Sequence, residues 1–197
     1  MSKRVKCVTL GDSTVGKTSM LDYYFCKNYL ASNESTIGAV FRTISKLKDD
    51  EIININFWDT AGQERYRSLI PMYIRQSSII LLIYDRTNVD SFNGLERWMS
   101  YIHQGCSGDF EIILISNKKD LHDKELVSDK AGSNLARKYN IPFYSISAKT
   151  GENIEDLMDY VMTKATSFKK QIINKKEKKV KLNDYESSYY NRCCSLS

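Results

Sequence analysis

Residues 11–18, GDSTVGKT, have a composition and spacing that suit phosphate binding. They match the pattern GxxxxGK[ST], in which backbone N–H groups of a glycine-rich loop surround the β-phosphate of a nucleotide. Lys17 can reach the β- and γ-phosphates, and Thr18 can give Mg²⁺ a hydroxyl ligand. The pattern predicts a nucleoside triphosphate site without choosing the base. The predicted contacts here are Gly11, Asp12, Ser13, Thr14, Val15, Gly16, Lys17, Thr18 and Ser19.

Two later segments, NKKD (117–120) and SAK (147–149), can choose the base. The carboxylate of Asp120 can accept hydrogen bonds from N1 and the exocyclic amino group of guanine, and adenine offers neither in that arrangement. The N–H of Ala148 can donate to guanine O6, while Asn117 and Lys118 hold the loop and cover the base. The segments therefore predict GTP rather than ATP. The predicted contacts on this side are Asn117, Lys118, Asp120, Ser147, Ala148 and Lys149.

A third segment, WDTAGQE (58–64), has residues suited to phosphoryl transfer to water. Asp59 can hold Mg²⁺ through a water molecule, the Gly62 N–H can meet the γ-phosphate, and Gln63 can orient the attacking water. Such a reaction needs no nucleophile from the protein, so His103 and His122 receive no role. The predicted catalytic residues are Gln63 and Lys17.

The elements that must position these motifs alternate along the chain. Apolar runs that predict strands lie at 5–10, 41–47, 52–58, 78–84, 111–116 and 142–147, and helical patterns lie at 17–26, 89–104, 128–138 and 153–168. This order predicts an α/β fold with a mostly parallel six-stranded sheet and helices on both faces, the three-layer fold of P-loop NTPases. Only the short polar turn KDDE separates the second run from the third, which predicts a hairpin and one antiparallel edge strand.

Composition limits the class of protein. The length of 197 residues suits one domain, which we place at 1–168, followed by a flexible lysine-rich tail at 169–197. The tail has 8 Lys or Arg against 3 Asp or Glu and so accounts for the whole net charge of +5. A nucleic-acid partner is not expected. A protein that binds nucleic acid usually carries a stripe of basic residues on its folded domain, whereas the excess charge here lies in the tail. Five cysteines do not suggest a disulfide framework, and we expect no signal peptide, membrane span or N-myristoylation.

Together these motifs resemble, in order and spacing, those of the Ras-like small GTPases over about residues 1–168. STIGAVF (35–41) and WDTAGQERYRSL (58–69) are similar to the two switch segments of the Rab branch. The resemblance implies that Thr36 binds Mg²⁺ and the γ-phosphate only in the GTP state, and that Tyr29 flanks the guanine ring. It also implies an effector surface made of Ile37, Gly38, Phe41, Trp58 and Tyr73. We expect its aromatic rings to face solvent, the alternative being that Trp58 and Tyr73 pack into the core.

The subgroup signal within this branch is mixed. Ser13 and NESTIGA resemble the early-endosomal members, whereas RSLIPMYIR (67–75) resembles the Golgi members. Many Rabs have YDIT where this chain has YDRT (84–87), which puts the charge of Arg86 directly after a predicted buried strand. Because Gln63 is retained, we expect slow GTP hydrolysis.

The resemblance implies a monomeric GTP/GDP switch in vesicle traffic with Mg²⁺ as its cofactor. Its expected partners are an exchange factor, a GTPase-activating protein, effectors, prenyl-transfer enzymes and a GDP-dissociation inhibitor. The alternatives are a P-loop kinase, a scaffold that binds nucleotide without hydrolysing it, and a Ras-branch signalling GTPase at the plasma membrane.

The segment RCCSLS (192–197) predicts lipid attachment at Cys193 and Cys194. CSLS alone fits a single farnesyl on Cys194, whereas paired cysteines in a Rab-like chain suggest geranylgeranyl on both, which we favour. The seven lysines from Lys169 to Lys181 can add attraction to an anionic leaflet. The expected location is the cytoplasmic face of intracellular membranes, endosomal or Golgi, in exchange with the cytosol.

Overall fold

The computed structural model describes residues 4–28, 36, 38–48, 51–62 and 68–170. Five predicted site residues, Tyr29, Ile37, Gln63, Cys193 and Cys194, lie outside these ranges. Within them, six strands form one sheet in the order β2-β3-β1-β4-β5-β6. The strands are β1 (Val5–Leu10), β2 (Ala39–Lys48), β3 (Glu51–Thr60), β4 (Ile79–Asp85), β5 (Glu111–Asn117) and β6 (Phe143–Ser145).

The strand directions confirm the predicted sheet. β2 pairs antiparallel with β3 and forms one edge, and the other neighbouring strands pair in parallel. β4 lies inside the sheet and is buried along its whole length, as its continuous apolar run predicts. Its side chains alternate between two cores, with Ile79, Leu81 and Ile83 in one and Ile80 and Leu82 in the other.

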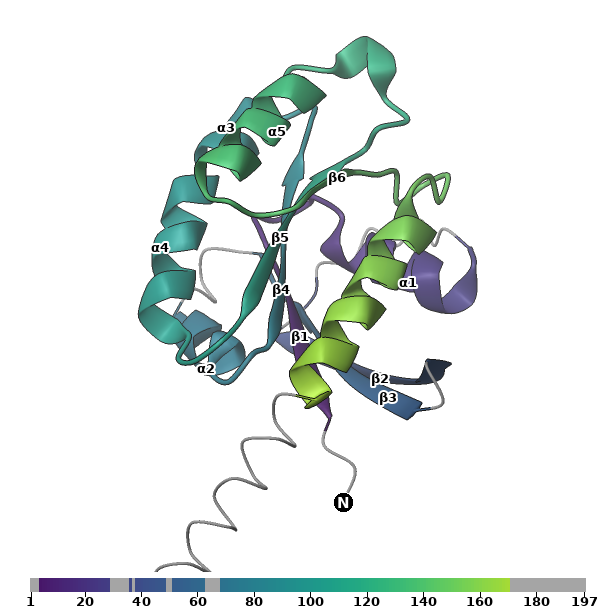
Figure 1. Cartoon of the computed structure of the whole chain (residues 1–197). Coiled ribbons are helices and arrows are strands. Elements are labelled where there is room, and N and C mark those ends of the chain that lie inside the picture. Colours follow the sequence, from purple (N-terminus) through teal and green to yellow (C-terminus); the bar gives the residue numbers. More distant parts are fainter. Residues whose placement is uncertain (1–3, 29–35, 37, 49–50, 63–67, 171–197) are drawn as a thin grey trace, which may run out of the picture.

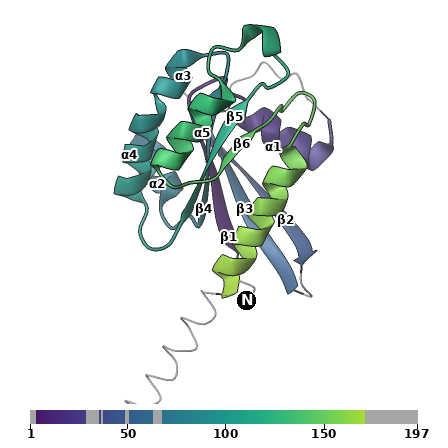
Figure 2. The ribbon, with the colours of Figure 1, turned by 45° about the horizontal axis from the view of Figure 1, so that its top comes forward.

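Helices cover both faces of the sheet (Figures 1 and 2). α1 and a final helix at 154–170 lie over one face, and α3, α4 and α5 lie over the other. No helix among the described residues is long and apolar enough to cross a membrane. The remaining helices are α1 (Lys17–Cys26), α2 (Ile70–Ile74), α3 (Val89–Asn93), α4 (Leu95–Gly105), α5 (Asp129–Lys138) and the 3₁₀ helix η2 (His122–Lys124).

Two helical features differ from the prediction. The helix expected at 89–104 is divided at Gly94 into α3 and α4, and a side chain at residue 94 would lie 3.1 Å from Asp12 Oδ2. α2 is absent from the predicted helical patterns, and its Ile70 and Ile74 are buried. The final helix continues to residue 170, and the division of the chain at 168 stays a prediction.

Candidate functional site

The predicted motifs meet along the edge of the sheet that is formed by the carboxyl ends of the parallel strands. β1 leads into residues 11–18, which we call the phosphate loop, and β3 ends just before Gly62. β5 ends at Asn117 and leads into residues 118–127, which we call the base loop. The segment 147–149 follows β6.

Two glycines give the phosphate loop its path. Gly11 and Gly16 have φ angles of 142° and 91°, which favour glycine. A Cβ would lie 2.1 Å from the Ile83 carbonyl oxygen at Gly11 and 2.2 Å from Asn117 Nδ2 at Gly16. Gly16 also precedes α1 without a side-chain cap, so the N–H groups of the first helical turn remain available to an anion.

Lys17 lies at the centre of this loop. Its side chain is buried (5% exposed), and Nζ donates to the carbonyl oxygens of Gly11 (3.0 Å) and Asp12 (2.7 Å). Burial lowers the pKa of the ammonium to about 8, although Asp59 and Asp12 oppose the change. A Cβ at Gly62 would lie 2.3 Å from Nζ, so the glycine after β3 lies directly against the lysine. The arrangement holds a cation where the β- and γ-phosphates are predicted.

We expect nucleotide affinity to fall as the pH rises through about 8. Phosphates favour the charged ammonium, and the lowered pKa means that the free protein loses this proton earlier than an exposed lysine would. Nucleotide affinity should fall about tenfold per pH unit between roughly pH 8 and the pKa that Lys17 has in the nucleotide-bound protein. Titration of GDP at fixed free Mg²⁺ over this range measures it. A flat profile, or the same fall in Lys17→Met, would contradict this role of Lys17.

Three oxygen donors suited to Mg²⁺ lie beside the phosphate loop. The hydroxyl oxygens of Thr18 and Thr36 are 2.8 Å apart. Asp59 is fully buried, with Oδ1 accepting from Thr9 Oγ1 at 3.1 Å and Oδ2 without a protein partner. Burial raises the pKa of Asp59, an effect that the Thr18 and Thr9 hydroxyls and Lys17 oppose. A hard cation is bound by such oxygens together with phosphates and water, so these residues fit Mg²⁺.

This donor set contains a single carboxylate. Among residues 4–28, 36, 38–48, 51–62 and 68–170, no group of three or more His, Cys, Asp or Glu side chains could hold a metal. Mg²⁺ commonly uses one or two carboxylates with substrate phosphates, so the fit depends on bound nucleotide.

Thr18→Asn is expected to weaken the Mg²⁺ dependence of nucleotide binding. The substitution removes a hydroxyl from the donor set and puts a bulkier amide next to Thr36. GTP affinity in Mg²⁺ should fall about tenfold or more, with a smaller change in EDTA. Thr163→Asn, on the exposed side of the final helix, is the matched control. An equal loss with and without Mg²⁺ would count against Thr18 as a ligand.

The base-side residues are also brought together. Asn117 is 1% exposed; its Nδ2 donates to the Val15 carbonyl at 2.8 Å, and its Oδ1 accepts from the Ala148 N–H at 3.0 Å. Asp120 Oδ1 accepts from the Ser147 hydroxyl at 2.6 Å. Asn117 therefore joins the phosphate loop to the segment 147–149. Because the Ala148 N–H is used here, its bond to guanine O6 stays a prediction. Nucleotide contact by the exposed Lys149 also stays a prediction.

Sequence reasoning missed three residues that position the site. Asp85 ends β4 and pairs with Lys118, with 2.6 Å between Oδ2 and Nζ. Its place at the end of a central strand was a usable signal, since the neighbouring strands end in motifs. Trp98 of α4 donates from Nε1 to Asp12 Oδ1 at 2.9 Å, and Arg97 lies 3.5 Å from the same oxygen. No pattern in the sequence indicates that contact.

The predicted effector aromatics form a continuous row with uneven exposure. The ring centroids of Phe41 and Trp58 are 5.3 Å apart, and those of Trp58 and Tyr73 are 6.4 Å apart. Phe41 is 47% exposed, whereas Tyr73 is 7% exposed and belongs to the core, so the expectation that these rings face solvent is wrong for Tyr73. Gly38 lies near Tyr73, since a Cβ at residue 38 would be 3.7 Å from the Tyr73 hydroxyl oxygen, and its carbonyl accepts from the Ala61 N–H at 2.8 Å. The effector role of these residues stays a prediction.

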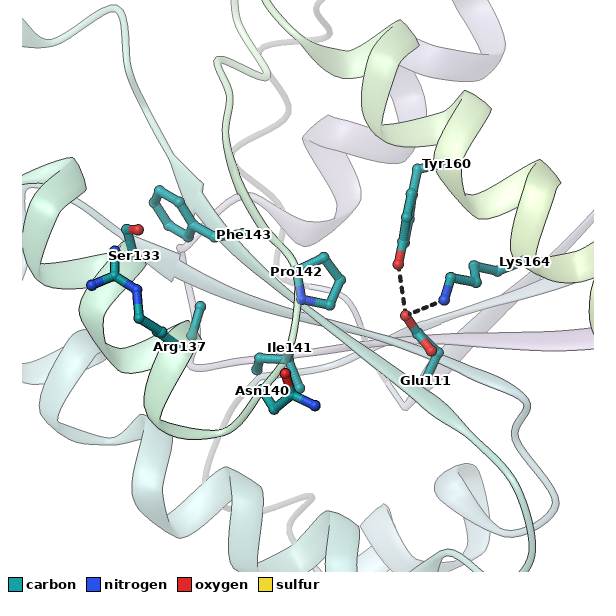
Figure 3. A pocket seen from close by; sticks show the side chains of 10 residues that line it. Glu111, Ser133, Arg137, Asn140, Ile141, Pro142, Phe143, Tyr160 and Lys164 are labelled. Atoms are coloured by element: carbon teal, nitrogen blue, oxygen red, sulfur yellow. Dashed lines mark hydrogen bonds and ion pairs between the residues drawn. The ribbon is translucent and has the colours of Figure 1, made fainter.

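A separate open hollow of about 640 Å³ lies between α5, β6 and the final helix (Figure 3). Among the side chains that line it, Glu111 accepts from the Tyr160 hydroxyl at 2.7 Å and from Lys164 Nζ at 2.8 Å. Arg137 also lines the hollow, away from this group. The hollow contains none of the predicted site residues, and we do not assign the nucleotide to it.

Comparison with models of known protein families adds an independent finding. The model of the Ras family matches residues 6–183. This range includes the phosphate loop, the segment 58–64, the base loop and the segment 147–149. The match therefore covers every motif that the structure brings to this edge of the sheet.

Proposed function

The chain belongs to the Ras family of small GTPases, and from this premise we propose that it is a Rab-type switch that recruits effectors in vesicle traffic. Membership in the family implies a GTPase that binds guanine nucleotides with Mg²⁺ and works with regulators and effectors. The observation that carries guanine-nucleotide binding is the side chain of Asn117, which bonds both Val15 and Ala148. Through it, the phosphate site and the guanine site form one unit.

Each residue has a defined part in binding. Lys17 holds the β- and γ-phosphates from a buried position, and the N–H groups at the start of α1 face the same anion. Asp120 accepts from the guanine edge, held in place by Ser147. When Mg²⁺ is bound by Thr18, Thr36 and Asp59, it neutralises charge on the β- and γ-phosphate oxygens.

Hydrolysis is assigned to water that Gln63 orients. The protein supplies position and charge rather than a nucleophile, so turnover is slow until a partner contributes an arginine. The contacts of Thr36 with Thr18 and of Gly62 with Lys17 support a switch, because one segment touches a residue assigned to Mg²⁺ and the other a residue assigned to the γ-phosphate. Loss of that phosphate removes the group that tethers both segments.

Gln63→Leu is expected to slow GTP hydrolysis and to prolong the effector-bound state. Leucine cannot hydrogen-bond the attacking water, so the single-turnover rate should fall about tenfold or more while GDP affinity stays unchanged. Release of phosphate from preloaded GTP measures the rate. An unchanged rate would favour the alternative of a scaffold that binds nucleotide without turnover.

Membrane attachment through the tail is the second part of the proposal. The adjacent Cys193 and Cys194 and the lysines before them support two geranylgeranyl groups aided by an anionic leaflet. The alternative is a Ras-branch signalling GTPase with one farnesyl on Cys194, which the CSLS sequence favours. Mass spectrometry of the C-terminal peptide from cells decides between them, and an unmodified peptide in membrane-bound protein would refute both.

The compartment we propose is endosomal, with the Golgi as the other candidate. Ser13 and NESTIGA support the former, and RSLIPMYIR supports the latter. Imaging a tagged copy beside endosomal, Golgi and plasma-membrane markers tests the proposal. Labelling confined to the plasma membrane would favour the Ras-branch alternative.

A further inference from the structure

Arg86 is a buried cation directly after β4. The residue is 3% exposed, and its guanidinium pairs with Glu125 and lies 3.8 Å from Asp129 Oδ1. A charge removed from water is tolerated when it is paired, and both partners come from the segment that follows β5. The side chain therefore links β4 to the far end of the base loop and the start of α5.

The backbone of Arg86 contacts both ends of the base loop. Its N–H donates to the Asn117 carbonyl at 3.2 Å, where the loop begins. Its carbonyl accepts from the N–H groups of Leu126 (2.9 Å) and Val127 (3.0 Å), where the loop ends. Asp85, the preceding residue, pairs with Lys118. Two consecutive residues thus hold the loop at its entry and its exit.

The base loop has few apolar anchors of its own. Residues 122–126 are exposed, and η2 has three residues. Val127 is the buried apolar side chain of the loop. Polar contacts therefore fix much of its position. Lys119 and Asp120 are bonded to residues 146, 147 and 152, and residues 85 and 86 hold the two ends of the loop on either side of Asp120 in the sequence.

We propose that Arg86 is a positioning residue for guanine recognition, which acts by holding the base loop through Glu125 so that Asp120 faces the base. The inference rests on the proposed guanine-nucleotide binding and extends it to a residue outside the nucleotide motifs. Arg86 does not touch the base in this scheme. Its loss lets the loop move, which weakens the two hydrogen bonds of Asp120 together.

The test compares GDP with IDP, which lacks the exocyclic amino group of guanine. Arg86→Met keeps an unbranched apolar stem and removes the charge. We expect GDP affinity to fall about tenfold and the preference for GDP over IDP to fall about threefold, because GDP loses two weakened bonds and IDP one. Arg86→Lys keeps the charge and should restore part of the preference.

Two further variants make the test decisive. Glu125→Ala removes the carboxylate that pairs with Arg86 and should also lower the preference for GDP over IDP. This variant tests the proposal if Arg86→Met does not fold. Arg137→Met, at an exposed position of α5, should change neither affinity nor preference. An equal loss for GDP and IDP, or unchanged preference in the folded variants, overturns the proposal. Failure of the unmodified protein to bind GDP overturns the proposed function as well.

Discussion

Replacing Asp120 by Asn should lower the affinity for GTP about 10³-fold and transfer the preference to XTP. The carboxylate, held by Ser147, accepts from two guanine donors. The asparagine amide turns an N–H donor toward the guanine amino group, so neither of these two donors has an acceptor. Xanthine presents a carbonyl oxygen where guanine carries its amino group, so the same N–H donor finds an acceptor. Competition titrations with GTP, XTP and ATP measure the change.

The matched control for Asp120→Asn is Asp123→Asn. Asp123 lies in the same loop, in η2, and is exposed. The control removes the same charge from the same segment and should leave GTP affinity unchanged. Equal losses in the two variants would mean that Asp120 acts through general electrostatics, and unchanged GTP affinity in Asp120→Asn would remove it from the base site.

Lys17→Met should lower GTP and GDP affinity about 10²-fold or more without lowering the stability of the nucleotide-free protein. The variant lacks the buried cation that is assigned to the phosphates, so nucleotide affinity falls. Its folded state no longer buries a charge, and that burial is unfavourable because the pKa of Lys17 is lowered from 10.5 to about 8. Below pH 8 the unmodified protein must bury a charged group, so the substitution removes that unfavourable contribution.

Two measurements separate these effects of Lys17→Met. Equilibrium titration gives the affinity, and thermal unfolding without nucleotide at neutral pH gives the stability. Lys138→Met, at an exposed position of α5, should change neither the affinity nor the stability. A large fall in the melting temperature of Lys17→Met would show that the lysine is a structural residue of the loop and that its effect on binding is indirect.

The sheet and the phosphate loop could be predicted from sequence because local patterns determine them. Continuous apolar runs indicate strands buried on both faces, and β4 is such a strand. Because parallel strands end at one edge, motifs placed after strands must meet, and Asn117 does contact Val15. That Lys17, Thr18 and Asp59 lie close together follows from their positions in the same way, and their roles stay predictions.

What could not be predicted depends on contacts between distant segments. α2 has five residues, with Pro71 in its first turn, and its Tyr73 is buried although the sequence favours an exposed ring. The bond from Trp98 to Asp12 joins residues 86 positions apart. Arg86 is unusual in the sequence, but its partner Glu125 becomes apparent only when β4 and the base loop lie side by side.

The central claim is that this chain is a GTP-dependent switch that hydrolyses GTP slowly. Loading the full chain with Mg²⁺ and GTP, with ATP as competitor, and following phosphate release in a single turnover tests it most directly. We predict tight binding of GTP and GDP, no displacement by ATP, and slow release of phosphate to water. Tight ATP binding, or transfer of the phosphoryl group to a small acceptor, would contradict the account and favour a P-loop kinase.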